Sequence, residues 1–351
     1  ALTSEAAGTI LSMSKLGEHH KPLADIIDEK SFVNAIVGLM ATGGSTNHTI
    51  HIIAMARAAG IILNWDDFDD ISKATPLLCK MYPNGQADVN HFREAGGMSV
   101  VISQLLDAGL VHDDVETIVG KGLSHYIAEP LLSDTTLTFE SGPKVSRDID
   151  VISSIEAPFS QEGGLRVLGG DLGRSVIKTS ALKPEHYLIE APAIVFESQE
   201  SLQGAFQKGE LEKDFIAIVR YQGPKANGMP ELHGLMPPLG VLQDKGYKVA
   251  IITDGRMSGA SGKVPSAIHC TPEALDGGVL SKVKTGDMIR FDITNGEITL
   301  LVDPKVLETR STQIPDLANN RYGFGRELFS SIRQSIGLAE EGASVFDIVG
   351  E

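Results

Sequence analysis

The residues best suited to chemistry lie in a glycine-rich stretch from Ile251 to Ala274. An apolar run at 247–253 leads into a loop whose acidic, basic and hydroxyl side chains alternate with glycines: Asp254, Arg256, Ser258, Ser261 and Lys263 among Gly255, Gly259 and Gly262. A buried strand that stops at such a loop is typical of an active site at the carboxyl end of a strand. Glycines let the backbone approach a ligand closely and leave N–H groups free to bind an anion. Ser258 could act here as a nucleophile, as a base or as an ordinary turn residue.

A second polar loop, at 221–233, follows the apolar run 215–219. If the two runs form neighbouring parallel strands, their loops meet in one crevice. The stretch from Arg220 to Lys263 carries six cationic and three acidic residues, a local charge of +3 in a chain of net charge −16. A basic cleft of this kind attracts an anionic substrate. The cations expected to contact that substrate are Lys225, Arg256 and Lys263.

Two nucleotide-binding motifs are excluded by their spacing. Gly262 and Lys263 are followed by Val264, and Met257 stands where a phosphate-binding loop needs its first glycine. The three glycines of the first loop do not have the spacing of a dinucleotide fingerprint either.

Several single polar residues keep more than one interpretation. Glu231 could be a Mg²⁺ ligand, a base, or an acidic residue favoured at a helix N-terminus. His48 and His51 are three apart and would share one helix face, which is a weak metal-binding pattern. His233 and His269 stand alone, and isolated histidines are more often structural than catalytic.

The polar segment 43–47 precedes a helical run that closes at Gly60. Ser45 or Thr46 is expected to cap this helix, with Gly60 just after its end. The alternative is that the free amides of this segment, together with Asn47, hold a phosphate or carboxylate group.

Periodicity predicts the elements that position these loops. Helices are expected at 3–15, 28–40, from Trp65, 89–95 and 98–108, and an amphipathic helix at 325–336. Strands covered on both faces are expected at 189–196, 215–219 and 249–253, and a hairpin at 288–302 with a type I′ turn at Asn295–Gly296. The mixed composition of 131–165 indicates a linker leading into the strands.

Length and composition set the outer bounds. The 351 residues suffice for two domains, and the net charge of −16 argues against nucleic acid and anionic membranes as partners. No apolar run approaches the roughly 18 residues of a membrane span. Cys79 and Cys270 exclude a disulfide framework and cannot by themselves ligate a metal cluster. We therefore expect a cytoplasmic protein, and the missing initiator Met suggests a processed or truncated chain.

Three long motifs, in this order, carry a family resemblance: ATGGSTNH at 41–48, GPKANGMPELH at 223–233 and TDGRMSGASGKVPSAIH at 253–269. Together with 168–174 and 190–198 they resemble the dihydroxyacid/6-phosphogluconate dehydratase family, with the closest likeness to members acting on 6-phosphogluconate. The resemblance implies an α/β protein in two parts. Residues 1–135 would be the end of a helix-rich α/β catalytic domain, and residues 136–351 a β-rich, swivelling, β/β/α barrel-like domain.

The resemblance also implies an activity. Family members are hydro-lyases, and the implied reaction dehydrates 6-phospho-D-gluconate to 2-dehydro-3-deoxy-6-phosphogluconate in the Entner–Doudoroff pathway. An iron–sulfur cluster, expected to be 4Fe-4S, would have its cysteine ligands upstream of this chain, with Mg²⁺ as a second metal in some members. A homodimer is implied, and this chain alone is expected to be inactive and to bind no iron.

By the same resemblance, Ser258 would be the base, acting as an alkoxide, and Glu231 a possible Mg²⁺ ligand. Ala260 replaces a Thr of some sugar-acid members, so Ser261 is expected to take over that contact. The full set of implied substrate-binding residues is Lys225, Asn227, His233, Arg256, Ser261, Lys263, Ser45, Thr46 and Asn47. The alternatives are another dihydroxy-acid or sugar-acid dehydratase of this family, and a non-catalytic anion-binding module.

Overall fold

The computed structural model describes residues 1–134, 136–258, 262–312, 314–323 and 325–346. They form two compact units, Ala1–Gly43 with Ile71–Gly163, and Gly44–Asp70 with Gly164–Glu351. We call the first the helical unit and the second the barrel unit. The expected boundary at 135/136 therefore differs from the observed division, because 136–163 belongs to the helical unit and 44–70 to the barrel unit.

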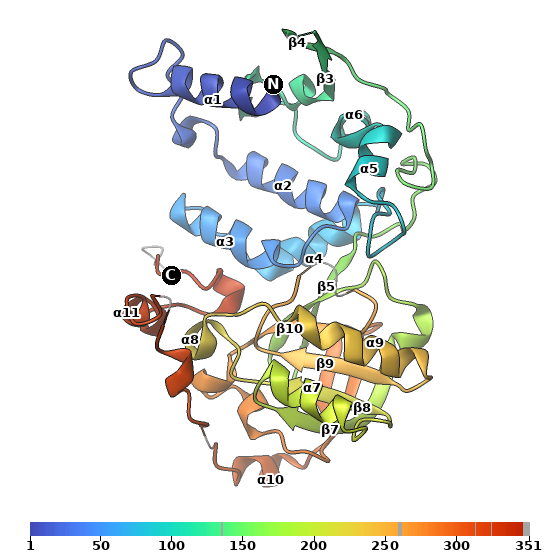
Figure 1. Ribbon diagram of the computed structural model, residues 1–351, viewed down its shortest axis with the longest axis vertical. Coiled ribbons are helices and arrows are strands. Elements are labelled where there is room, and N and C mark those ends of the chain that lie inside the picture. Colours follow the sequence, from blue (N-terminus) through green and yellow to red (C-terminus); the bar gives the residue numbers. More distant parts are fainter. Residues whose placement is uncertain (135, 259–261, 313, 324, 347–351) are drawn as a thin grey trace. The chain divides into compact units, whose positions relative to one another are not determined.

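The helical unit is built from four α-helices and part of a fifth among its described residues: α1 (Leu2–Met13), α2 (Glu29–Thr42), α5 (Val89–Ala95), α6 (Gly97–Asp107) and the end of α4 (Trp65–Ala74) (Figure 1). Asp28 caps α2, since its side chain accepts from the Ser31 N–H at 2.7 Å. Val37, Val100 and Leu105 are buried in the core between α2 and α6.

The predicted linker at 131–165 is wrong in its first part. Strand β3 (Ala128–Ser133) pairs antiparallel with β4 (Thr136–Ser141), and two isolated bridges, Leu77 to Ser160 and Cys79 to Ile152, return the chain to the helical unit. A short pair, β1 (Glu116–Thr117) and β2 (Gly120–Lys121), precedes them. The β-branched residues of this segment therefore serve local pairing in the helical unit.

The barrel unit contains a closed barrel with the strand order β10-β6-β5-β12-β11-β7-β8-β9. Its strands are β5 (Leu165–Gly170), β6 (Arg174–Lys178), β7 (Leu188–Phe196), β8 (Phe215–Val219), β9 (Val249–Thr253), β10 (Ser266–Thr271), β11 (Met288–Asp292) and β12 (Glu297–Leu300). Strands β7, β8, β9 and β10 run parallel to one another, so their carboxyl ends share one edge. All five residues of β8 and all five of β9 are buried, as expected for strands covered on both faces. The α/β class and the barrel-like second unit are thus confirmed.

The α-helices of the barrel unit are α3 (His48–Ala58), α7 (Gln199–Gln207), α8 (Pro224–Asn227), α9 (Met236–Asp244), α10 (Pro304–Glu308) and α11 (Ser330–Gln334), with α4 beginning in this unit (Figure 1). Helices α7 and α9 connect parallel strands, as crossovers between such strands require. Among the described residues, the 3₁₀ turns are η1 (Leu23–Asp25), η2 (Leu123–Ile127), η3 (Pro184–His186), η4 (His233–Leu235), η6 (Ala274–Asp276), η7 (Val279–Lys282), η8 (Ala318–Asn320) and η9 (Ala339–Glu341).

Two local predictions in this unit need correction. Strands β11 and β12 form the expected antiparallel hairpin, but of Asn295 and Gly296 only the glycine has a positive φ, 70°. A type I′ turn needs positive φ at both positions, so this turn is of another type, closed by Asp292 accepting from the Asn295 N–H at 3.0 Å. The predicted helix at 325–336 is also too long, since α11 has five residues.

The barrel interior is apolar, with fully buried residues from several strands, among them Ile177, Ile218, Ile252 and Phe291. Cys270 is buried in the same core. In the described residues, no helix has the length and apolar character needed to cross a membrane.

Candidate active site

Two polar loops leave the shared edge of β8 and β9. The strands are in parallel register, with Val219 opposite Thr253. Beyond the strands, Glu231 and Arg256 form a parallel bridge, and the Leu232 N–H donates to the Arg256 carbonyl at 3.2 Å. The predicted meeting of the two loops is therefore confirmed.

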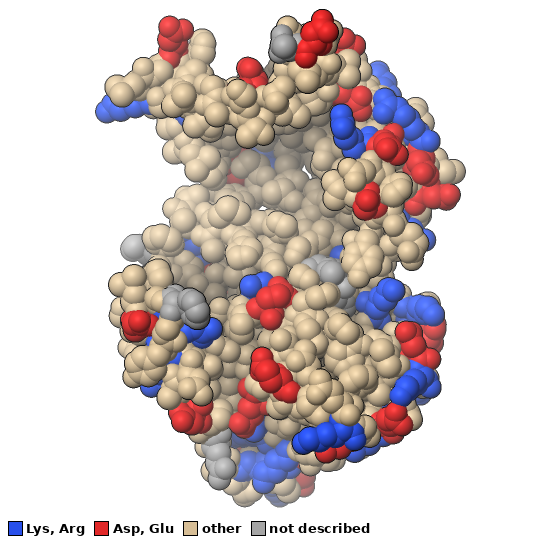
Figure 2. Space-filling view, in the orientation of Figure 1, with Lys and Arg blue, Asp and Glu red and all other residues tan. Residues whose placement is uncertain are grey.

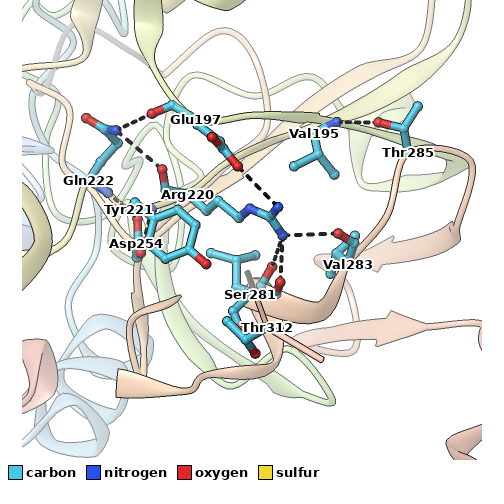
Figure 3. Close-up of polar contacts among 11 residues, drawn as sticks. Val195, Glu197, Arg220, Tyr221, Gln222, Asp254, Ser281, Val283, Thr285 and Thr312 are labelled. Atoms are coloured by element: carbon cyan, nitrogen blue, oxygen red, sulfur yellow. Dashed lines mark hydrogen bonds and ion pairs between the residues drawn. The ribbon is translucent and has the colours of Figure 1, made fainter. Parts of the chain in front are cut away.

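Asp254 ties together the segments that follow three of the parallel strands. Its carboxylate accepts from the backbone N–H groups of Tyr221 at 3.1 Å and Gln222 at 2.9 Å (Figure 3). It also accepts from the backbone N–H of Ala274 at 3.0 Å. Complete burial raises the pKa of Asp254 to about 6, although the three donors pull the pKa down. The sequence placed Asp254 in the loop but did not reveal this anchoring role, because its partners lie 20 to 33 positions away.

Arg220, at the end of β8, belongs to the scaffold. Its guanidinium donates to the carbonyls of Ser281 at 2.7 Å and Val283 at 3.1 Å, and approaches a carboxylate oxygen of Glu197 at 3.5 Å (Figure 3). These contacts fix the segment after β10 to the end of β8.

The hub of the two loops is Glu231. One oxygen, Oε1, accepts from the Ser258 N–H at 2.8 Å and from the His233 N–H at 3.0 Å. The other, Oε2, pairs with the Arg256 guanidinium at 2.7 Å, and Arg256 Nε also donates to the Met229 carbonyl at 2.7 Å. The structure thus brings together four residues singled out from the sequence.

The side chain of Ser258 lies beside an imidazole. Its Oγ is 3.5 Å from His233 Nδ1, a long contact that could tighten when a substrate binds. Serine next to histidine is an arrangement in which a proton can pass from the hydroxyl to the ring. Sequence reasoning treated the two residues separately, since 25 positions separate them.

Potential metal ligands are not gathered into one group within the described residues. Across the described ranges, no three His, Cys, Asp or Glu side chains are grouped so as to hold a metal ion. Glu231 already accepts from three donors, two on Oε1 and one on Oε2, which leaves one of the roughly four acceptor positions of its carboxylate for a Mg²⁺ ion. Cys79 and Cys270 are both buried in different units, and burial raises the pKa of Cys79 to about 12, so that the thiol stays protonated.

Two side chains predicted to bind substrate are already bonded to other side chains of the protein. The Lys225 ammonium pairs with Asp276 at 2.7 Å. The amide of Asn227 donates to Gln222 at 2.9 Å and accepts from Arg326 at 3.0 Å. Their role in substrate binding stays a prediction, and it would require these contacts to open.

A second buried carboxylate lies under α8. Glu273 is 5% exposed and accepts from the backbone N–H groups of Lys225 at 2.7 Å and Ala226 at 3.1 Å. Burial is the main cause that raises the pKa of Glu273 to about 7.

The local positive charge is smaller than the count from the sequence suggests. Of the six cations between Arg220 and Lys263, four are paired or occupied, since Lys245 contacts Glu212 at 2.6 Å in addition to the three contacts already described. Figure 2 shows basic and acidic side chains interspersed over the visible face of the barrel unit. Lys263 is exposed, whereas Ser261 lies outside the described residues.

Lys178, at the end of β6, is a basic residue near this loop that the sequence did not reveal. It is 7% exposed, and its Cδ would lie 3.5 Å from a Cβ placed on Gly262. Burial lowers the pKa of Lys178 to about 8. Lys178 is the last residue of β6, and its place in the sequence did not indicate a function.

At the start of α3 the predicted cap is wrong. The N-cap is Asn47, whose side chain makes no capping bond, while Ser45 Oγ accepts from the Asn47 N–H at 3.3 Å. Thr46 is buried, and within the described chain neither its Oγ1 nor Asn47 Oδ1 has a hydrogen-bond partner. His48 Nδ1 lies 3.1 Å from the Ser45 carbonyl oxygen, and among the described residues no third His, Cys, Asp or Glu joins His48 and His51 in a metal-binding group. The predicted ligand role of the 45–47 segment stays open.

Fold and site together define a two-unit α/β protein with two polar loops that meet at the carboxyl edge of parallel barrel strands. Two family models match nearly the whole chain: dihydroxy-acid/6-phosphogluconate dehydratase N-terminal at residues 1–126, and the C-terminal model of the same family at residues 150–343. The chain belongs to the dihydroxy-acid/6-phosphogluconate dehydratase family.

Within this family, the chain is 57% identical over 344 residues to a phosphogluconate dehydratase of Escherichia coli K12, covering 98% of this chain and 57% of that protein. It is 54% identical to the phosphogluconate dehydratase of Rhizobium meliloti, with 98% and 57% coverage. A dihydroxy-acid dehydratase of Caldanaerobacter subterraneus is 35% identical, with 86% and 52% coverage. The chain therefore spans a little over half the length of the curated relatives it matches.

Proposed function

We propose that the complete protein carrying this chain dehydrates 6-phospho-D-gluconate to 2-dehydro-3-deoxy-6-phosphogluconate. Relatives named phosphogluconate dehydratase are 50–57% identical to the chain, against 35% for the relative named dihydroxy-acid dehydratase. The observation that carries the proposal is the convergence of Ser258, His233, Arg256 and Glu231 in one crevice.

The reaction needs a base at C2 of the substrate, since the C2 proton is weakly acidic. In this proposal Ser258 Oγ removes that proton, and His233 Nδ1, at 3.5 Å, is the group placed to take the hydroxyl proton from Ser258. Glu231 Oε1 accepts from the backbone N–H groups of both Ser258 and His233. This shared acceptor keeps the proposed base, Ser258, close to its proposed proton acceptor, His233.

Charge also has to be held at both ends of the substrate. Arg256, fixed by Glu231 and the Met229 carbonyl, presents a cation beside the base, where enolate charge develops. Lys263 is exposed and is proposed to reach the carboxylate or phosphate group, with Ser45, Thr46 and Asn47 at the start of α3 as further contacts.

The departure of the C3 hydroxyl is not assigned to a residue of this chain. Family membership suggests an iron–sulfur cluster, with Mg²⁺ as a second metal, and the described residues contain no group of three or more His, Cys, Asp or Glu side chains that could hold either one alone. We propose that the cluster ligands lie outside these 351 residues. We further propose that residues 1–135 end a catalytic domain, that the barrel swivels to close over substrate, and that the complete protein is a cytoplasmic homodimer.

The test is turnover by the complete gene product. Formation of a 2-keto acid is measured with 6-phosphogluconate and, separately, with 2,3-dihydroxyisovalerate. We expect a strong preference for the phosphorylated substrate. A preference for the branched-chain acid would support the second candidate, a dihydroxy-acid dehydratase, which the 35% relative represents. Binding of 6-phosphogluconate without turnover of either acid would support an anion-binding module.

A further inference from the structure

His269 occupies an unusual place in the barrel. It lies in β10 with no exposed surface and has a φ of 60°. At this point the pairing of β10 with β6 shifts register, between Ile268 and Thr271. A left-handed backbone conformation is uncommon in a side-chain-bearing residue, and such positions cluster at functional sites.

The hydrogen bonds of His269 determine its tautomer. Its Nδ1 lies 3.3 Å from Thr49 Oγ1, and the Thr49 hydroxyl lies 2.8 Å from the Thr46 carbonyl. A carbonyl can only accept, so the single hydroxyl proton of Thr49 goes to Thr46. Thr49 Oγ1 therefore accepts from the ring, which assigns the proton of His269 to Nδ1.

The other ring nitrogen is then a bare acceptor. Among the described residues, His269 Nε2 has no hydrogen-bond partner. Complete burial lowers the pKa of His269 to about 3, so the ring stays neutral near pH 7. A buried acceptor without a donor is unfavourable, and a bound ligand that donates to it removes that cost.

The surroundings of His269 narrow the chemistry of that ligand. The backbone N–H of His269 donates to the Gly255 carbonyl at 2.9 Å, which ties the backbone at His269 to the loop that carries Arg256 and Ser258. The charge of Arg256 acts on the ring and opposes the approach of a metal cation. A lone acceptor cannot bind a phosphate or carboxylate oxygen. The partner of this acceptor must carry a proton, and in a phosphorylated sugar acid the groups that do so are neutral hydroxyls.

We propose that His269 Nε2 accepts a hydrogen bond from a hydroxyl of the substrate's polyol chain and so helps to select a polyhydroxy acid. This inference rests on the proposed function and names a contact within the same site. The unpartnered Oγ1 of Thr46, in the segment that holds Thr49, is a second group available to such a substrate.

The test compares His269→Asn with His269→Gln in the complete gene product. Asparagine tolerates the left-handed backbone and can still donate to Thr49, but it has no atom at the Nε2 position. Glutamine places an acceptor near that position. We expect His269→Asn to raise the KM and the dissociation constant for 6-phosphogluconate roughly tenfold, in line with the loss of one buried hydrogen bond. His269→Gln should recover part of that loss.

Deoxy substrates identify the contact. The 4-deoxy and 5-deoxy analogues of 6-phosphogluconate should bind the parent protein more weakly, and for one of them His269→Asn should add no further loss. Equal KM and affinity for parent and His269→Asn, with thermal unfolding unchanged, would overturn the proposal. So would nitrogen NMR of the imidazole showing the proton on Nε2.

These outcomes separate the two proposals. If the parent protein binds 6-phosphogluconate but does not turn it over, the proposed reaction fails, while weaker binding by His269→Asn still supports the acceptor role. If turnover is normal and His269→Asn matches the parent, only the His269 contact fails.

Discussion

A single carboxylate organises the chemistry of the crevice. Glu231 accepts from two backbone N–H groups and from Arg256, and so places Ser258, His233 and the guanidinium with one side chain. From the sequence, three roles were possible for Glu231: a metal ligand, a base, or an acidic residue at a helix N-terminus. The structure shows a hydrogen-bond hub, and its proposed metal role stays a prediction.

Substituting Glu231 by Gln tests this hub. An amide keeps one acceptor but turns an NH₂ group toward Arg256 or the Ser258 N–H, so kcat of the complete protein should fall roughly 10- to 100-fold, as expected for a lost charged hydrogen bond. Steady-state kinetics check it. Glu190→Gln is the matched control, because Glu190 pairs with Arg290 at 2.9 Å on the exposed barrel surface. Equal kcat in both variants would contradict the hub.

The sequence allowed the candidate site residues to be predicted, but not the side-chain contacts that each of them makes. The meeting of the two loops followed from their positions after parallel strands. That the Lys225 ammonium contacts Asp276, or that Asn227 contacts Arg326 across 99 positions, depends on how distant segments pack. Neither periodicity nor spacing contains that information.

At the scale of elements, buried carboxylates hold the ends of parallel strands together. Asp254 joins the segments after β8, β9 and β10, and Glu273 accepts from two N–H groups of α8. Both lie where donors from separate loops would otherwise be buried without acceptors.

Asp254→Asn should lower the free energy of unfolding by roughly 1–3 kcal/mol, since an NH₂ group replaces an oxygen that faces backbone donors. Urea unfolding measures the change. Asp303→Asn is the control: Asp303 caps the exposed helix α10 by accepting from the Lys305 N–H at 2.8 Å, and asparagine caps equally well. A loss no larger than that of the control would show that Asp254 does not anchor the loops.

Glu273 predicts a pH dependence. The pKa of Glu273 in the folded protein, about 7, lies above the ordinary value of 4.5 for a glutamate, so the folded state holds the proton more tightly. Its contribution to stability is present below about pH 4.5 and is lost as the pH rises through about 7, by up to about 3 kcal/mol. Asp254 acts in the same direction up to about pH 6.

The free energy of unfolding should therefore decrease between pH 5 and 7.5, and Glu273→Gln should flatten part of that slope. Urea unfolding at a series of pH values checks this. A parent protein that gains stability over the same interval, or a variant with an unchanged slope, would be inconsistent with a protonated Glu273.

Elements with a strong apolar pattern were predicted well from the sequence, but the turns and caps at the ends of elements were not. Strands β8 and β9 match the predicted bounds, because a continuous apolar run marks a strand buried on both faces. The predictions of the α3 cap and of the hairpin turn were wrong. Both depend on the dihedral angles at Asn47 and Asn295, which residue type alone does not determine.

At the scale of the whole molecule, the division into two units was the least accessible feature. Segment 136–163 looked like a linker, yet it returns to pair with residues 77–79. Segment 44–70 read as part of a helical domain, yet Thr49 contacts His269 in the barrel unit. Long-range contacts of this kind decide domain membership, and composition does not report them.

The central claim is that Ser258 removes a proton from 6-phosphogluconate. The most direct measurement is keto-acid formation by the complete gene product and by its Ser258→Ala variant, with iron content and thermal unfolding matched. We expect turnover by the parent and a loss of roughly 10²- to 10⁴-fold in the variant, the range of general-base catalysis. Near-normal turnover by Ser258→Ala would contradict the account.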